Sequence, residues 1–136
     1  MATTIAQLTL TSTDLLSDSL AVSAVATLTA AGNSTGLTRT EGLGRKQTAN
    51  TSEYTLFDAS EHTDDKAHKI YLKNLSTTAA QHFIVEIAGV VVGRLYAGDW
   101  AFFPWSADTT ETADCDITIT PSANDMMLEY MLFTDE

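Results

Sequence analysis

Residues 82–105, with the sequence HFIVEIAGVVVGRLYAGDWAFFPW, constrain the fold more than any other part of the chain. Apolar and polar side chains alternate on both sides of a central Ala-Gly-Val segment, which is the pattern of two antiparallel strands joined by a tight turn. A two-residue loop at 88–89 would place Arg94 beside Phe83 on the core face, which is costly. The register therefore favours a three-residue loop, Ala88–Val90.

The same alternation recurs along the chain, between segments rich in Gly, Pro, Asn and Asp. Strands are predicted at residues 5–10, 19–29, 54–57, 69–75, 116–120 and 126–133. The 22 threonines agree with this, because Thr is β-branched and fits a half-solvated pleated face. With 136 residues and a hydrophobic fraction of 44%, the chain has material for one core. We predict an all-β fold, an antiparallel β-sandwich that is jelly-roll-like, in a single domain over residues 1–136.

Three segments are less regular. Residues 14–31 alternate like a strand, but their Ala and Leu also allow a capped helix; the Thr and Val content favours the strand. Residues from about 36 to 52 contain three glycines and few apolar side chains, which predicts a long surface loop or a loosely held edge strand. Residues 1–12 are expected to form an N-terminal arm.

Net charge and cysteine content limit the classes of binding partner and the cellular compartment that we expect. Eighteen acidic and seven basic residues give a net charge of −11, so nucleic-acid phosphates would be repelled and no nucleic-acid partner is expected. No apolar run is long enough to span a bilayer, so no membrane partner is expected either. Cys115 is the single cysteine, which excludes an intramolecular disulfide. The N-terminus has no signal-peptide pattern, so we expect synthesis and folding in a reducing cytoplasm.

The sequence predicts no catalytic, cofactor or metal site. His62 and His68 flank two aspartates, but their spacing matches no zinc pattern, and a carboxylate-rich turn is ordinarily solvated. Three histidines and many serines do not define a specific nucleophile and base. We therefore expect a protein that is not an enzyme.

Two clusters of apolar side chains are the candidate interaction residues. Four aromatic residues lie between positions 100 and 105, and the last predicted strand, 126–133, is apolar on both faces. The aromatic side chains could fill the end of the core, anchor an interface, or form a sugar-stacking platform. The candidate interface residues are Trp100, Phe102, Trp105, Met127, Met131 and Phe133.

Three stretches together resemble a known class of proteins: residues 69–76 (KIYLKNLS), 92–105 (VGRLYAGDWAFFPW) and 128–133 (LEYMLF). They resemble small β-sandwich virion proteins of tailed bacteriophages, in particular capsid decoration (cement) proteins of marine and cyanobacterial phages. The resemblance implies a non-enzymatic virion structural protein, assembled in the host cytoplasm, that binds the outside of a phage head. Its partner would be the major capsid protein or another virion protein. The alternative is a tail- or fibre-associated subunit, or a carbohydrate-binding module involved in host adsorption.

The last predicted strand also indicates self-association. Its side chains Met127, Met131 and Phe133 would expose an apolar stripe on a monomer, which soluble proteins rarely tolerate. We expect a homo-oligomer, with a trimer favoured, whose subunits exchange or share the N-terminal segment. Residues Ile5–Leu10 could add as a strand to a neighbour's sheet edge.

Overall fold

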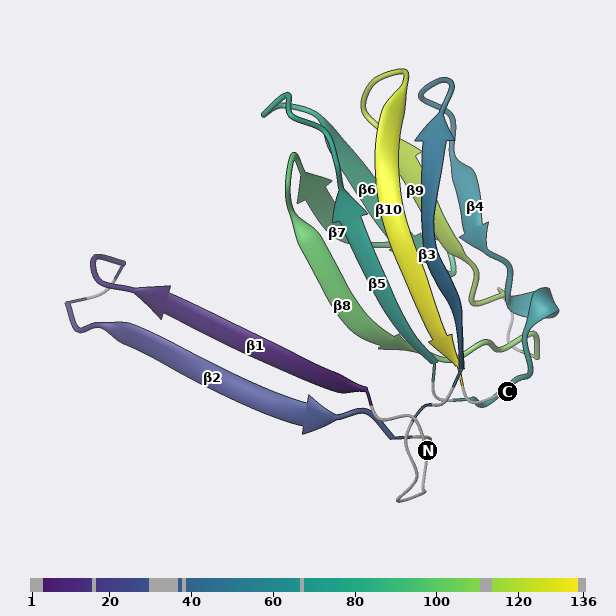
Figure 1. The fold of residues 1–136 in the computed structure, drawn as a ribbon. Coiled ribbons are helices and arrows are strands. Elements are labelled where there is room, and N and C mark those ends of the chain that lie inside the picture. Colours follow the sequence, from purple (N-terminus) through teal and green to yellow (C-terminus); the bar gives the residue numbers. More distant parts are fainter. Residues whose placement is uncertain are drawn as a thin grey trace. The chain divides into compact units, whose positions relative to one another are not determined.

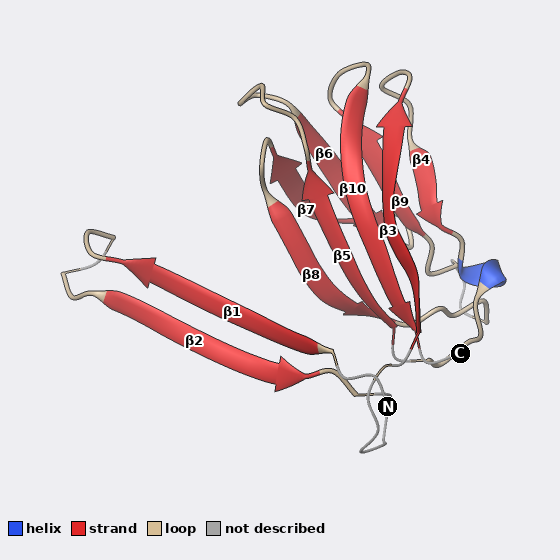
Figure 2. Cartoon of the chain, in the orientation of Figure 1, coloured by secondary structure: helices blue, strands red, loops and turns tan. Residues whose placement is uncertain are grey.

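The computed structural model describes residues 4–15, 17–29, 37, 39–66, 68–110 and 114–134. Across these residues the regular structure consists of β-strands and one short 3-10 helix, η1 (Ala59–Glu61), as Figure 2 shows. The strands are β1 (Ile5–Ser12), β2 (Leu20–Thr27), β3 (Arg39–Thr48), β4 (Tyr54–Phe57), β5 (His68–Asn74), β6 (His82–Ile87), β7 (Val90–Tyr96), β8 (Trp100–Trp105), β9 (Ile117–Pro121) and β10 (Met126–Thr134). Every strand pairing is antiparallel, so the predicted all-β, antiparallel fold is confirmed.

The chain divides into two compact units, residues 1–38 and 39–136. In the first unit, β1 and β2 form a hairpin whose pairing runs without a shift from Ile5 opposite Thr27 to Ser12 opposite Leu20. The strand prediction for this part of the chain is confirmed, and the helix alternative is wrong. Strand β1 therefore has its partner within its own chain.

The second unit is a β-sandwich of two four-stranded sheets, ordered β3-β10-β5-β8 and β4-β9-β6-β7 (Figure 1). The pairs are nested: β6 with β7 is innermost, followed by β5 with β8, β4 with β9, and β3 with β10 outermost. Successive strands lie in alternate sheets except at the β6–β7 hairpin. The predicted antiparallel β-sandwich is thus confirmed.

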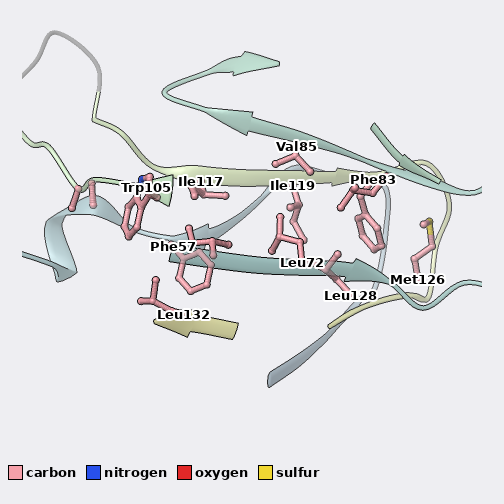
Figure 3. Close-up of a cluster of buried hydrophobic side chains, with 14 residues drawn as sticks. Phe57, Leu72, Phe83, Val85, Trp105, Ile117, Ile119, Met126, Leu128 and Leu132 are labelled. Carbon is pink, nitrogen blue, oxygen red and sulfur yellow. The ribbon is translucent and has the colours of Figure 1, made fainter. Parts of the chain in front are cut away.

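The core lies between the two sheets and is built from side chains that alternate inward. In β5 every second residue from His68 to Asn74 is buried, whereas Lys69, Tyr71 and Lys73 are only partly buried. Burying one large apolar side chain stabilises a protein by roughly 1.5–3 kcal/mol, so this cluster is what holds the sheets together. The buried cluster, shown in Figure 3, comprises Phe57, Ala59, Ile70, Leu72, Phe83, Val85, Leu95, Trp105, Ala107, Ile117, Ile119, Met126, Leu128 and Leu132.

The long loop predicted at about 36–52 is wrong for most of its length. Residues Arg39–Thr48 form the edge strand β3, paired with β10, which is the alternative that the sequence left open. An edge strand needs few apolar residues because one of its edges and most of its side chains meet solvent. Gly44 of β3 has no room for a side chain, because a Cβ there would lie 2.6 Å from Cζ of Tyr130, whose ring occupies that space.

The β6–β7 hairpin has a two-residue turn instead of the predicted three-residue loop. Ile87 pairs with Val90, and the two turn residues, Ala88 and Gly89, have φ angles of 52° and 72°. Positive φ at both central positions is the geometry of a type I′ turn, which matches the twist of the flanking strands.

A register shift between Val85 and Glu86 is what makes the shorter turn acceptable. This irregularity moves the pairing by one residue, so Arg94 lies opposite Ile84 on the outer side of the sheet. The charged side chain never meets Phe83 on the core face. The sequence prediction failed because it assumed a regular ladder throughout the hairpin.

Replacing Ala88 by Asn is expected to stabilise the protein by about 0.5–1 kcal/mol, because Asn tolerates the left-handed region in which Ala is strained. Urea denaturation at equilibrium measures the change. Ala80, an exposed turn residue outside the positive-φ set, gives the matched control Ala80→Asn. The left-handed turn would be contradicted if both variants gained equally, or if neither did.

Candidate functional site

One face of the sandwich carries most of the predicted interaction residues. The strands β3, β10, β5 and β8 lie side by side in one sheet (Figure 1). Their alternate residues point away from the core, because their strand neighbours are buried in it. We call this outward surface the aromatic face. It comprises Leu43, Arg45, Lys69, Tyr71, Lys73, Trp100, Phe102, Met127, Glu129, Met131 and Phe133.

Five of the six predicted interface residues belong to the aromatic face. Trp100 and Phe102 come from β8, and Met127, Met131 and Phe133 come from β10. The two strands are separated by β5, and the pairing register places Met131 and Phe102 in one row and Phe133 in the next. The sheet thus brings together residues of β8 and β10 that are about thirty positions apart in the sequence.

Trp105 is the exception, and the structure corrects its assignment. Its side chain is only 4% exposed and belongs to the core cluster. The indole Nε1 donates a hydrogen bond to the carbonyl oxygen of Cys115 at 2.8 Å. Alternation along β8 is not broken at Pro104, so Trp105 points inward, opposite His68 in β5. In this chain Trp105 is a core residue.

An apolar row crosses the aromatic face from edge to edge. Leu43, Met131, Tyr71 and Phe102 occupy one row of the register, each on a different strand. Leu43 at one edge is 59% exposed. Phe133 extends this apolar row on one side, because its ring packs edge to face on the ring of Phe102 with centroids 6.2 Å apart.

The neighbouring row is polar and salt-linked, and it ends in an exposed tryptophan. Arg45 donates two hydrogen bonds to the Glu129 carboxylate, at 3.0 and 3.1 Å, and Tyr71 Oη donates a third at 3.3 Å. Burial raises the pKa of the Tyr71 phenol, and the negative charge and hydrogen bond of Glu129 raise it further. Lys73 separates Glu129 from Trp100, which is 54% exposed.

The charge of the aromatic face differs from that of the whole protein. Arg45, Lys69 and Lys73 are three of the seven basic residues in a chain whose net charge is −11. The acidic member of this face, Glu129, is neutralised by Arg45. The face is therefore basic and apolar on an acidic molecule, a combination suited to an acidic protein surface that also carries apolar groups.

The outer side of the other sheet has a different composition. Thr and charged side chains predominate, beside the apolar Ile84 and Val91, and Tyr96 packs on His82 with ring centroids 4.9 Å apart. We call this side the threonine face; it comprises Thr55, His82, Ile84, Glu86, Val91, Arg94, Tyr96, Thr118 and Thr120. In its described residues it differs from the aromatic face in lacking an apolar row that crosses all four strands.

The two histidines considered as ligands lie at one end of the core. The rings of His62 and His68 have centroids 5.4 Å apart, and each lies 5.3 Å from the Trp105 ring. Among the residues that the structure describes, no group of three or more His, Cys, Asp or Glu side chains is arranged to hold a metal ion. The described geometry assigns these histidines a packing role.

Several residues of the aromatic face were missed from the sequence. Leu43 and Arg45 lie in the segment predicted as a long surface loop or a loosely held edge strand. Lys69, Tyr71 and Lys73 alternate with apolar residues in a predicted strand, so the period of two alone places them on a common outward side. That signal was present, but nothing in the sequence indicated which strands would lie beside β5.

Comparisons with protein-family models, with curated proteins and with solved structures gave no match to this chain. No helix in the described residues has the length and apolar character needed to cross a membrane.

Proposed function

We propose that the protein is a non-enzymatic virion structural protein, a capsid decoration (cement) protein that binds the outside of a bacteriophage head. It would be assembled in the host cytoplasm and located in the virion. The observation that carries the proposal is the aromatic face, an apolar row beside Lys69 and Lys73 on a strongly acidic protein. Exposed apolar patches of this kind mark protein-binding surfaces.

We further infer that the sandwich is a jelly roll. The nested pairing of β3 with β10 through β6 with β7 is what results when one long eight-stranded hairpin is wound into two sheets. Jelly rolls recur in viral capsid and lectin domains, so this topology supports both a virion role and its carbohydrate-binding alternative. Because folds host many functions, the topology supports the proposal less strongly than the aromatic face does.

The partner surface follows from the chemistry of the aromatic face. Leu43, Phe102 and Met131 require apolar contacts, whereas Lys69 and Lys73 favour carboxylates. Four strands of about six residues cover roughly 400 Å², given the strand spacing and rise. A stable interface buries about 800 Å² per partner, so one copy would bind a shell weakly and several linked copies would bind well.

Co-sedimentation with empty heads assembled from the major capsid protein tests the proposal. Trp100→Glu places a carboxylate on the aromatic face, and we expect at least about a tenfold loss of head binding. Tyr96→Glu is the matched control: Tyr96 is also an exposed aromatic residue, at 42%, but lies on the threonine face. Binding should also weaken as salt rises, because exposed lysine–carboxylate pairs are screened.

Unchanged head binding by Trp100→Glu would overturn the aromatic face as the attachment surface. Equal losses in both variants would overturn it as well, since the effect would then follow net charge rather than position. Competition by free sugars would instead support the alternative function.

The alternative is a tail- or fibre-associated subunit or a carbohydrate-binding module. It is favoured by Trp100, whose ring is 54% exposed beside Lys73 on an open sheet. An exposed tryptophan can stack on a sugar ring, and a neighbouring lysine can donate hydrogen bonds to hydroxyls. Glycan-array binding that Trp100→Ala abolishes would support this alternative; Trp105 is not a suitable target because it is buried.

A further inference from the structure

The β1–β2 hairpin has one side that is apolar over most of its length. Opposed residues of an antiparallel pair share a side, so the register assigns each pair to one of two faces. On one face lie the pairs Ala6–Ala26, Leu8–Ala24 and Leu10–Val22, followed at the end of the hairpin by Ser12–Leu20. We call this the apolar hairpin face.

Within the described residues of the hairpin unit, nothing covers the larger side chains of the apolar hairpin face. Leu8, Leu10 and Val22 are 37%, 47% and 43% exposed. The opposite face is mixed: it carries the polar Gln7, Thr9 and Ser23, together with Ile5 and Val25. An isolated two-stranded hairpin is at best marginally stable in water, so this one needs a surface that covers its apolar side.

The charge of the hairpin indicates what kind of surface that is. Neither β1 nor β2 contains a charged residue, although the chain as a whole carries a net charge of −11 and the segment that joins the two strands contains Asp14 and Asp18. The paired strands of different copies can therefore approach one another without repulsion between charged side chains of the strands themselves. An uncharged apolar face also offers nothing with which to select a charged partner.

We propose that the apolar hairpin face binds the same face of other copies of this chain, in a closed three-fold ring of hairpins. Two hairpins stacked face to face would bury only about 800 Å² in total, given strand dimensions, which is below the range of stable interfaces. They would also leave the outer edges of β1 and β2 unpaired. A ring instead pairs β2 of one copy with β1 of the next, antiparallel, and removes the edges.

Three hairpins give a six-stranded barrel with the apolar faces inside. Such a barrel is narrower than the eight-stranded one that ordinary core side chains fill, so small inward residues are required. Ala6, Ala24 and Ala26 supply them toward one end, while Leu8 and Leu10 fill the remainder. The ring requires no shell, so it stands independently of the proposed attachment function.

Sedimentation equilibrium of the full chain at micromolar concentration tests this inference. We expect the wild-type protein to have a mass three times 14.6 kDa. Leu10→Glu places a carboxylate in the ring interior and should raise the dissociation constant at least about a hundredfold, giving a monomer. Thr9→Glu, one residue away on the opposite face, adds the same charge and should leave the trimer intact.

Engineered cysteines give a second readout that does not require dissociation. Val22→Cys should form intermolecular disulfides on mild oxidation because the ring brings inward residues of different copies together. Ser23→Cys faces outward and should not, and the wild-type chain controls for the native Cys115. Fluorescence of the buried Trp105 verifies that the sandwich is folded in each variant.

A monomeric wild-type protein, or any assembly of another size, would overturn the three-fold ring. Equal dissociation of Leu10→Glu and Thr9→Glu would overturn the assignment of the apolar hairpin face. Failure of the attachment function has a different signature: Trp100→Glu should remain trimeric whether or not it binds heads.

Discussion

The Trp105→Ala variant is expected to lose about 3–5 kcal/mol of folding free energy, the usual cost of removing a large buried aromatic side chain. The Trp105 ring lies 6.0 Å from Phe57 and 5.3 Å from both His62 and His68, centroid to centroid. Its loss also leaves the Cys115 carbonyl without the indole donor, which adds about 1 kcal/mol. Domains of this size are stable by only about 5–15 kcal/mol, so a large fraction of the stability disappears.

Trp100→Ala is the matched control, on the same strand. Trp100 is 54% exposed, so its removal should cost less than about 1 kcal/mol in urea denaturation. Similar losses in the two variants would contradict the assignment of one tryptophan to the core and the other to the aromatic face. For head binding we expect the opposite order: Trp100→Ala should weaken binding more than Trp105→Ala, because Trp100 is the exposed tryptophan of the aromatic face.

The fold class could be predicted because it depends on local alternation. Segments such as β5 and β10 have a period of two whichever strands lie beside them, and their turn residues mark where they end. That was sufficient to predict an antiparallel sandwich. The order of the strands was not predictable in this way, because the nested pairing joins residues as far apart as β3 and β10.

The errors came from places where a strand departs from the regular pattern. The sequence could not decide between a loop and an edge strand at β3, because an edge strand has little apolar content and because Gly44 is also typical of a loop, although here Tyr130 occupies the space of its Cβ. The β6–β7 turn was mispredicted because the register shift after Val85 cannot be seen in the sequence. Trp105 was included among the interface candidates because a cluster of aromatic residues alone does not show which of them face inward; β8 continues through Pro104 at the sheet edge, and the alternation turns Trp105 into the core.

The candidate site was predicted in part for the same reason. Aromatic and Met side chains identified β8 and β10 as contributors, and the structure places their outward residues on one face. The basic residues between them, Lys69 and Lys73, became relevant only once β5 was known to lie between those strands. The charge contrast that supports the proposed function is thus a property of the sheet order.

The Asn74→Asp variant is expected to lose about 3–5 kcal/mol at neutral pH, because it leaves a buried charge without a partner. Asn74 is fully buried at the end of β5. Its Nδ2 donates to the carbonyl oxygens of Gln81, at 3.2 Å, and Leu95, at 3.0 Å, and its Oδ1 accepts from the Ser76 N–H at 2.9 Å. These bonds tie a strand of one sheet to β7 in the other, so they help to fix the two sheets together.

The pH dependence distinguishes a buried charge from a merely lost hydrogen bond. The carboxyl group introduced at position 74 faces two carbonyl oxygens, so its pKa in the folded state lies above the unfolded value of about 3.9. Between the two pKa values the folded state holds a proton that the unfolded state has released, so stability falls as pH rises through this window. The deficit relative to wild type, measured in urea, should therefore be larger at pH 7 than near pH 4. Asn124→Asp, on an exposed turn, should cost little at either pH, and an equal, pH-independent loss in both variants would contradict the buried network.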